Sequence, residues 1–107
     1  MEGENPAMSD PNLNHVRKAL AKLDHLVVQD IFLTETAQMA DVVFPASAFA
    51  ETDGVCTNTE RRVQRLRQAV PPPGEAKPDW WIISQIAQRM NLKGFEYESA
   101  KDVFNEL

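Results

Sequence analysis

Short apolar runs and segments of helical periodicity alternate in the first half of the chain. Apolar residues recur at intervals of three and four between residues 10 and 22, which predicts an amphipathic helix that starts near Ser9 and Asp10. A continuous apolar run, Leu-Val-Val at residues 26–28, predicts a strand that is covered on both faces. Residues 34–40 begin with a threonine suited to capping and predict a short helix of two turns.

A second strand is predicted over residues 41–44, where a β-branched and aromatic run is stopped by Pro45. Proline has no amide hydrogen to continue a β-ladder, so we expect the strand to end at Phe44. Before the first helix, Gly3 to Pro6 resemble the turn that closes an earlier strand. Strands that alternate with helices predict the α/β class, here a Rossmann-like αβα domain with a parallel sheet.

The middle of the chain adds a second kind of sheet. Asp53 and Gly54 are a typical turn pair, and we expect Gly54 to take the positive φ that a tight reversal needs. Residues 55–59 and 62–66 can form extended segments. An antiparallel β-hairpin is therefore predicted in this region.

Two helices are predicted in the last third of the chain, after an extended Pro-Pro-Pro-Gly connector at residues 71–74. The first is expected to begin with Asp79 as its cap and to end at Gly94. The Asp79 carboxylate also has the acceptors to bind the two N–H groups of a guanine edge. Ser99 and Asp102 resemble a capping box, with aspartate in place of glutamate, and predict the start of the second helix.

Composition places the chain among ordinary folded proteins. Of its 107 residues 43% are apolar and 25% are charged, so we expect a single domain over residues 1–107. The net charge of −5 argues against sequence-independent binding of nucleic acid, which needs a positive surface. No run of eighteen apolar residues is present, and we expect no membrane insertion. One local basic group is either a solvated strand face or a phosphate-contacting patch, and its members are Arg61, Arg62, Arg65 and Arg67.

The residues that bind metals are few and scattered. A single cysteine, Cys56, rules out an internal disulfide and a cysteine-built iron–sulfur site within this chain. We expect its thiol to be half-buried and to act as a packing residue. His15 and His25 lie far in sequence from other ligand residues, so no metal site is predicted.

Polar residues follow each predicted parallel strand. They are Asn5 to Ser9, Gln29 and Asp30, and Ala46 and Ser47. Ligands of open parallel α/β sheets bind beyond the carboxyl ends of the strands, so we expect a ligand at this edge. Asp30 follows Asn5 at an offset close to the ~20 residues at which a dinucleotide-binding fold places an acid against ribose hydroxyls. The glycine fingerprint for a pyrophosphate is absent, and Asp30 is equally typical of a turn.

Five blocks of sequence occur in a fixed order. They are Gly3–Pro6, Val28–Phe32, Thr34–Ala37 with Ala40–Pro45, Asp53–Gly54 with Asn58–Gln64, and Lys77–Trp80. Together they resemble the molybdopterin oxidoreductases that carry a bis-molybdopterin guanine dinucleotide. The nearest likeness is to the catalytic (alpha) subunit of formate dehydrogenase, over residues 3–107. Nitrate reductases and the large subunit of NADH-quinone oxidoreductase share much the same blocks.

The resemblance implies that the chain is a fragment of a larger subunit, from the αβα domain that holds one of two pterin guanine dinucleotides. The positions for which it implies a cofactor-binding role are Asn5, Ser9, Gln29, Asp30, Ala46 and Asp79. Asp79 stands where a carboxylate is expected to face the guanine. Ala46, where some relatives have serine, can offer only its backbone, and Phe44 replaces the leucine that is more usual before Pro45.

For the parent enzyme the resemblance implies oxidation of formate to CO2, with electrons passing from a molybdenum or tungsten centre to a [4Fe-4S] cluster. The cysteines for that cluster, the cysteine or selenocysteine that binds the metal, and the catalytic histidine and arginine have no counterpart in these residues. We therefore expect no catalytic residue here and no activity in the isolated chain. The expected partners are the rest of the catalytic subunit and its electron-transfer subunits, in the cytoplasm or, alternatively, in the periplasm.

A free-standing nucleotide-binding or protein-interaction domain is the alternative. It would dock through its acidic surface and the helix that contains Trp80 and Trp81. The incomplete first strand favours the fragment, and the unpaired strand edge expected at the cut would let two copies associate.

Overall fold

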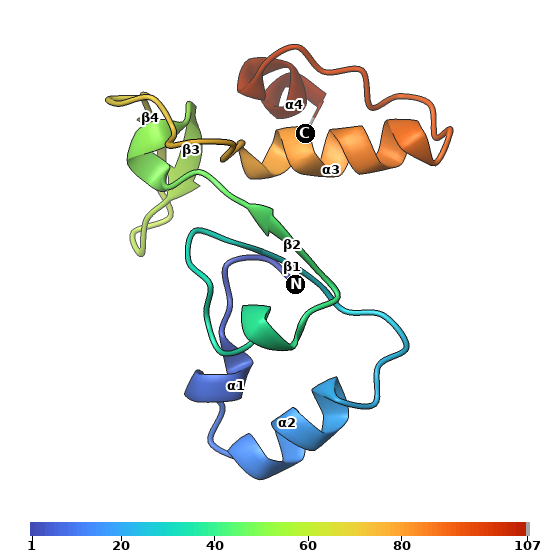
Figure 1. Ribbon diagram of the computed structural model, residues 1–107. Helices are drawn as coiled ribbons and strands as arrows, with labels where there is room; N and C mark the ends of the chain where they lie inside the picture. Colours follow the sequence, from blue (N-terminus) through green and yellow to red (C-terminus); the bar gives the residue numbers. More distant parts are fainter. Residues whose placement is uncertain (107) are drawn as a thin grey trace. The chain divides into compact units, whose positions relative to one another are not determined.

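Two parallel strands form the centre of the first part of the chain in the computed structural model, which describes residues 1–106 (Figure 1). β1 spans Val27–Asp30 and β2 spans Val42–Pro45. The parallel pairing predicted from the sequence is confirmed, and β2 runs one residue past its predicted end. Pro45 fits there because the last residue of a strand needs no further donor.

The amino end of the chain pairs with β1. Glu2 forms a parallel bridge with Gln29. The Gln29 N–H donates to the Met1 carbonyl at 2.8 Å, and the Gln29 carbonyl accepts the Gly3 N–H at 2.9 Å. The turn that begins at Gly3 thus follows an extended, parallel segment, as the sequence predicts.

The hydrophobic core of this part lies on β1. Val28 is fully buried, and Leu26 and Ala37 pack against it. Three half-buried residues cover the edge of this cluster, namely Leu20, Ala40 and Val43. The apolar run at 26–28 therefore forms a buried strand, as its composition predicts.

The helices of the first part are shorter than predicted. α1 spans Pro6–Ser9 and α2 spans Leu13–Leu20, in place of one helix over residues 10–22. The cap of α2 is Asn12, whose side-chain oxygen accepts a first-turn N–H at 3.3 Å. The predicted start near Ser9 and Asp10 is wrong, because the Asp10 carboxylate instead accepts the Asn12 N–H at 2.8 Å in a local turn.

The short helix predicted over residues 34–40 is a single 3₁₀ turn, η1, over Ala37–Met39. The Thr34 hydroxyl oxygen accepts the Ala37 N–H at 3.3 Å. This bond caps the start of the turn, and the turn ends because the backbone is extended at Ala40, with φ −81° and ψ 148°.

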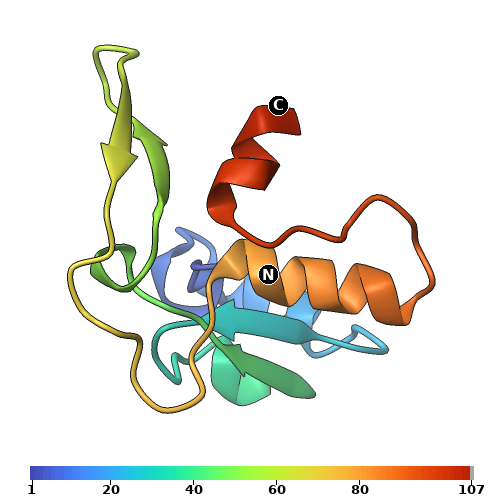
Figure 2. The ribbon, with the colours of Figure 1, turned by 90° about the horizontal axis from the view of Figure 1, so that it is seen from above.

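The described chain divides into two compact units, residues 1–46 and the residues from 47 onward, and each is described by itself. The second unit starts with η2, a 3₁₀ turn over Phe49–Glu51. It continues into an antiparallel hairpin, in which β3 spans Gly54–Thr57 and β4 spans Val63–Leu66 (Figure 2). The predicted hairpin is confirmed.

The hairpin reverses after Asn58, and the turn predicted at Asp53 and Gly54 is wrong. The Asn58 side-chain oxygen accepts two backbone N–H groups of the turn at 3.0 Å each. Arg61 takes the positive φ, 62°, whereas Gly54 lies inside β3 with a φ outside that region. An asparagine that binds two turn amides supplies the reversal, so the glycine is not needed for it.

Two helices complete the second unit (Figure 2). α3 spans Asp79–Arg89 and α4 spans Ala100–Glu106. α3 ends before the predicted Gly94, because Asn91 takes the left-handed conformation, with a φ of 59°, that closes a helix. Ser99 starts α4 as predicted.

These elements make a mixed α/β fold with one parallel strand pair and one antiparallel hairpin. The Rossmann-like αβα arrangement and the single domain over residues 1–107 stay predictions. Within residues 1–106, every helix is too short or too polar to cross a membrane.

Candidate functional site

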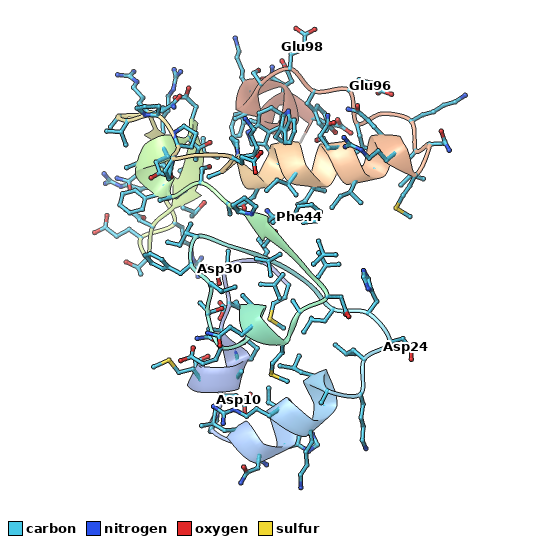
Figure 3. The ribbon with its side chains drawn as sticks, in the orientation of Figure 1. Asp10, Asp24, Asp30, Phe44, Glu96 and Glu98 are labelled. Carbon is cyan, nitrogen blue, oxygen red and sulfur yellow. The ribbon has the colours of Figure 1, made fainter. Side chains whose placement is uncertain are left out.

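The carboxyl ends of the two strands meet at Asp30 and Ala46, as the sequence predicts. The Ala46 N–H donates to the Asp30 carbonyl at 3.0 Å. Asp30 lies where β1 passes into the following loop (Figure 3), and its Oδ1 accepts the N–H groups of Ile31 at 2.7 Å and Phe32 at 3.4 Å. Its Oδ2 accepts no hydrogen bond from residues 1–106. Asp30 therefore shapes a turn with one carboxylate oxygen, and the other oxygen has acceptor capacity left.

Gln29 and Ala46 are the buried members of the predicted set, at 6% and 8% exposure. Both backbone hydrogen-bonding groups of Gln29 are used by the sheet. The Ala46 N–H donates to the Asp30 carbonyl, so the backbone contact predicted at Ala46 would have to use the Ala46 carbonyl.

Asn5 and Ser9 lie together after the first extended segment. The Ser9 hydroxyl donates to the Asn5 carbonyl at 3.0 Å, and its oxygen accepts no hydrogen bond within residues 1–106. The Asn5 side chain donates to a Glu35 carboxylate oxygen at 2.7 Å and accepts from the hydroxyl and N–H of Thr36 at 2.8 and 3.1 Å. The Ser9 hydroxyl thus keeps acceptor capacity, whereas the Asn5 side chain has one donor hydrogen left.

Asp79 lies in the second unit and is the first residue of α3, half-buried. Pro78 occupies the N-cap position, so the predicted cap role of Asp79 is wrong. Pro78 is extended, with φ −59° and ψ 144°, and the helix begins only after it. A carboxylate in the first turn still interacts favourably with the positive end of the helix dipole.

Ser47 is a polar residue that the prediction of individual site residues left out. The residue is 7% exposed, and its hydroxyl has no hydrogen-bond partner within residues 1–106. Its N–H donates to the Lys77 carbonyl at 2.9 Å, which holds it beside the segment that leads to Asp79. A buried hydroxyl without a hydrogen-bond partner is costly, which makes Ser47 a further candidate for a ligand contact. The signal in the sequence was its place directly after Ala46.

The residues considered for metal or phosphate binding are exposed. Within residues 1–106, no three His, Cys, Asp or Glu side chains are placed to hold a metal ion. Cys56 is exposed on β3, which corrects the expected half-buried position. The four arginines of the hairpin are exposed, and the Nε of Arg62 lies 3.7 Å from a Glu60 carboxylate oxygen. Such a surface pair contributes little stability, and the group fits a solvated strand face.

A cavity of about 980 Å³ opens in the second unit. Side chains of the hairpin, α3 and α4 line it, among them Val55, Trp80 and Phe104. Neither the predicted site residue Asp79 nor the buried Ser47 is among its lining residues.

The chain matches a family model described as molybdopterin oxidoreductase over residues 1–89. It is similar to the alpha subunit of an F420-dependent formate dehydrogenase from Methanocaldococcus jannaschii, with 59% identity over 106 residues. It is also similar to the alpha subunit of F420-dependent formate dehydrogenase 2 from Methanococcus maripaludis, with 55% identity over 106 residues. Each match covers 98% of this chain and 16% of the relative.

The fold is similar to that of a solved enzyme, acetylene hydratase from Pelobacter acetylenicus. The TM-score is 0.82 and the sequence identity is 32%. The match covers 96% of this chain and 15% of the hydratase chain. The chain thus corresponds to a small part of each of these proteins.

Proposed function

Because the chain belongs to the molybdopterin oxidoreductase family, we propose that it forms part of the site for a molybdopterin guanine dinucleotide in a formate dehydrogenase-like subunit. The family match over residues 1–89 carries the proposal, since it includes every candidate residue. These residues are Asn5, Ser9, Gln29, Asp30, Ala46 and Asp79. The chain spans 16% of the two formate dehydrogenase subunits, so the parent activity is part of the proposal.

The polar atoms of this chain suit a nucleotide. The open Oδ2 of Asp30 can accept hydrogen bonds from ribose hydroxyls, and the Ser9 hydroxyl can accept one more. The Asp79 carboxylate is suited to the two N–H groups of a guanine edge. The buried hydroxyl of Ser47 lacks a partner within residues 1–106 and would gain one. These groups bind and orient the nucleotide, and none of them is assigned a catalytic role.

The chemistry that the bound cofactor supplies is acceptance of two electrons at molybdenum or tungsten, as formate loses a proton and becomes CO2. The metal ligands, the catalytic residues and a [4Fe-4S] cluster are proposed to lie in the rest of the parent subunit. That remainder, together with electron-transfer subunits, is the proposed partner. The relatives' designation as alpha subunits supports such an assembly.

Asp79 provides the test, in the full-length parent subunit. Asp79→Asn replaces one acceptor oxygen with a donor that faces the guanine N–H groups. A charge-assisted hydrogen bond contributes roughly 1.5 to 3 kcal/mol, so the nucleotide should be held about ten- to a hundredfold more weakly. The readout is the amount of GMP that acid hydrolysis releases per purified subunit, with thermal stability measured beside it.

Two variants serve as controls. Asp24→Asn makes the same change at an exposed loop position and should leave the nucleotide content unchanged. Asp79→Ala should lose the nucleotide as well, because both acceptor oxygens are gone. Full nucleotide content in Asp79→Asn, or a parent subunit that releases no GMP at all, would contradict the proposal.

A further inference from the structure

Asn5 is a centre of hydrogen bonding in the first unit. Its carbonyl accepts the N–H groups of Met8 at 3.0 Å and Ser9 at 2.9 Å, and the Ser9 hydroxyl at 3.0 Å. Its side chain reaches across to the segment that precedes η1, where it meets Glu35 and Thr36. The residue therefore joins the turn after the first extended segment to the connection between β1 and β2.

The orientation of the Asn5 amide is fixed by its two neighbours. Glu35 offers a carboxylate, which accepts only from the amide nitrogen, at 2.7 Å. Thr36 offers a backbone N–H, which donates only to the amide oxygen, at 3.1 Å. A flipped amide would place a donor against the N–H and an acceptor against the carboxylate. The Asn5 donor also lowers the pKa of Glu35, which keeps that carboxylate ionised as an acceptor.

Thr36 is the buried end of this connection, at 0% exposure. Its hydroxyl donates to the Asn5 side-chain oxygen at 2.8 Å and accepts the Ala7 N–H at 3.0 Å. Both hydrogen-bonding roles of the hydroxyl are filled by residues of the turn. Because Thr36 is fully buried and its hydroxyl bonds, among the described residues, only to Asn5 and Ala7, its influence on a ligand would pass through that turn.

We infer that Thr36 and Asn5 are positioning residues of the candidate nucleotide site, which fix the turn of residues 5–9, that is Asn5 and the single helical turn α1, so that it presents the Ser9 hydroxyl. The inference rests on the proposed nucleotide-binding function and changes the role of Asn5 within it. The Asn5 oxygen already accepts two hydrogen bonds from Thr36, and one amide hydrogen is taken by Glu35. Asn5 acts mainly by holding the turn, and Ser9 makes the contact.

The turn of residues 5–9 is also attached to β1, through Gly3. Gly3, two residues before Asn5, bonds to the Gln29 carbonyl at the edge where β1 runs into Asp30. A turn that is anchored at Gly3 and at Asn5 has little freedom before Ser9. Holding a ligand-binding group in place before the ligand arrives removes the entropy cost of ordering it on binding.

The test uses the full-length parent subunit and two substitutions at Thr36. Thr36→Val keeps the shape of the side chain but removes its hydroxyl, and Thr36→Ser keeps the hydroxyl. The measurement is the rate at which bound guanine nucleotide is lost, followed as GMP released by acid hydrolysis of protein recovered from timed desalting columns. Loss of one or two hydrogen bonds from the turn predicts release about five- to tenfold faster in Thr36→Val. Thr36→Ser should restore the original rate.

A matched control separates positioning from general stability. Asp41→Ala removes another hydrogen bond between a side chain and the backbone, at the residue that precedes β2. It should lower the melting temperature without speeding nucleotide release. In addition, Ser9→Ala should have no further effect on the release rate once Thr36→Val is present, because both changes act on the same contact.

The possible outcomes are distinct. Release from Thr36→Val at the original rate, or equal acceleration in Asp41→Ala for the same fall in melting temperature, would overturn the positioning role. Failure of Thr36→Ser to rescue the rate would do the same. A parent subunit that holds no guanine nucleotide would instead refute the proposed function on which the inference rests.

Discussion

The Asp41 carboxylate accepts the Leu26 N–H at 2.6 Å, and the Leu26 carbonyl accepts the Asp41 N–H at 2.8 Å. These reciprocal bonds join the residues that directly precede β1 and β2. Asp41→Ala should lower the free energy of unfolding by about 1–2 kcal/mol, because the Leu26 N–H loses its charged acceptor. Urea denaturation measures the loss, and amide hydrogen exchange at Leu26 locates it.

Two further variants identify the interaction at Asp41. Asp41→Asn keeps a side-chain oxygen and should cost less than Asp41→Ala. The His25 Nδ1 lies 3.6 Å from the Asp41 carboxylate, but both side chains are more than half exposed. His25→Ala should therefore change the free energy of unfolding by no more than about 0.5 kcal/mol. Equal losses in His25→Ala and Asp41→Ala would assign the effect to the ion pair instead.

The cap of α4 predicts a dependence on pH. The Ser99 hydroxyl donates to the Asp102 carboxylate at 2.8 Å and accepts the Asp102 N–H at 3.3 Å. The Ser99 hydroxyl is the main cause that lowers the pKa of Asp102. Since the folded pKa lies below the unfolded one, this contribution to stability is complete above the ordinary aspartate pKa of about 3.9. It is lost as the pH falls through the folded pKa.

We therefore expect amide protection in residues 100–106 to weaken in acid, below about pH 4. NMR titration of the Asp102 carboxyl carbon gives the pKa directly. Ser99→Ala should move that pKa back toward its ordinary value, and Asp102→Asn should remove the cap's pH dependence. An Asp102 pKa at or above the ordinary value in the unchanged chain would contradict the cap as the cause.

Ser47→Ala should have opposite effects on stability and on ligand binding. Without ligand the buried hydroxyl has no partner within residues 1–106, so its removal should leave stability unchanged or raise it by about 1 kcal/mol. In the parent subunit the same change should weaken retention of the guanine nucleotide. Thermal melting of the chain and GMP content of the subunit are the two measurements.

The matched control is Ser84, the other buried serine of this unit. Ser84 is 3% exposed, and its hydroxyl donates to the Trp80 carbonyl at 2.7 Å. Ser84→Ala removes a satisfied group and should leave nucleotide retention unchanged. If Ser47→Ala destabilised the ligand-free chain, the hydroxyl would already have a hydrogen-bond partner there, and the prediction would be wrong.

Features with local signals could be predicted closely. The cap formed by Ser99 involves Asp102, three residues further on, and the hydrogen bonds of the Ser99 hydroxyl with the Asp102 carboxylate and with the Asp102 N–H are both present. The buried apolar run at 26–28 and the proline at the end of β2 likewise act on their own strand. The prediction of a cap was less accurate where several residues compete for the position. Asn12 caps α2, and not Ser9 or Asp10 as predicted. All three side chains are suited to capping, so the sequence does not show which of them will accept the N–H groups of the first turn.

The sequence by itself determined the kinds of element, the parallel and antiparallel pairings and the polar residues at the carboxyl ends of the strands. It could do so because periodicity, proline and turn residues act over a few neighbouring positions. Only the tertiary structure decided what those polar residues do. Asn5 is held by Thr36, 31 residues further along the chain, and the Ser47 hydroxyl is buried without a partner within residues 1–106. Such roles depend on which groups the folded backbone brings within 3 Å of one another, and no local pattern encodes that distance.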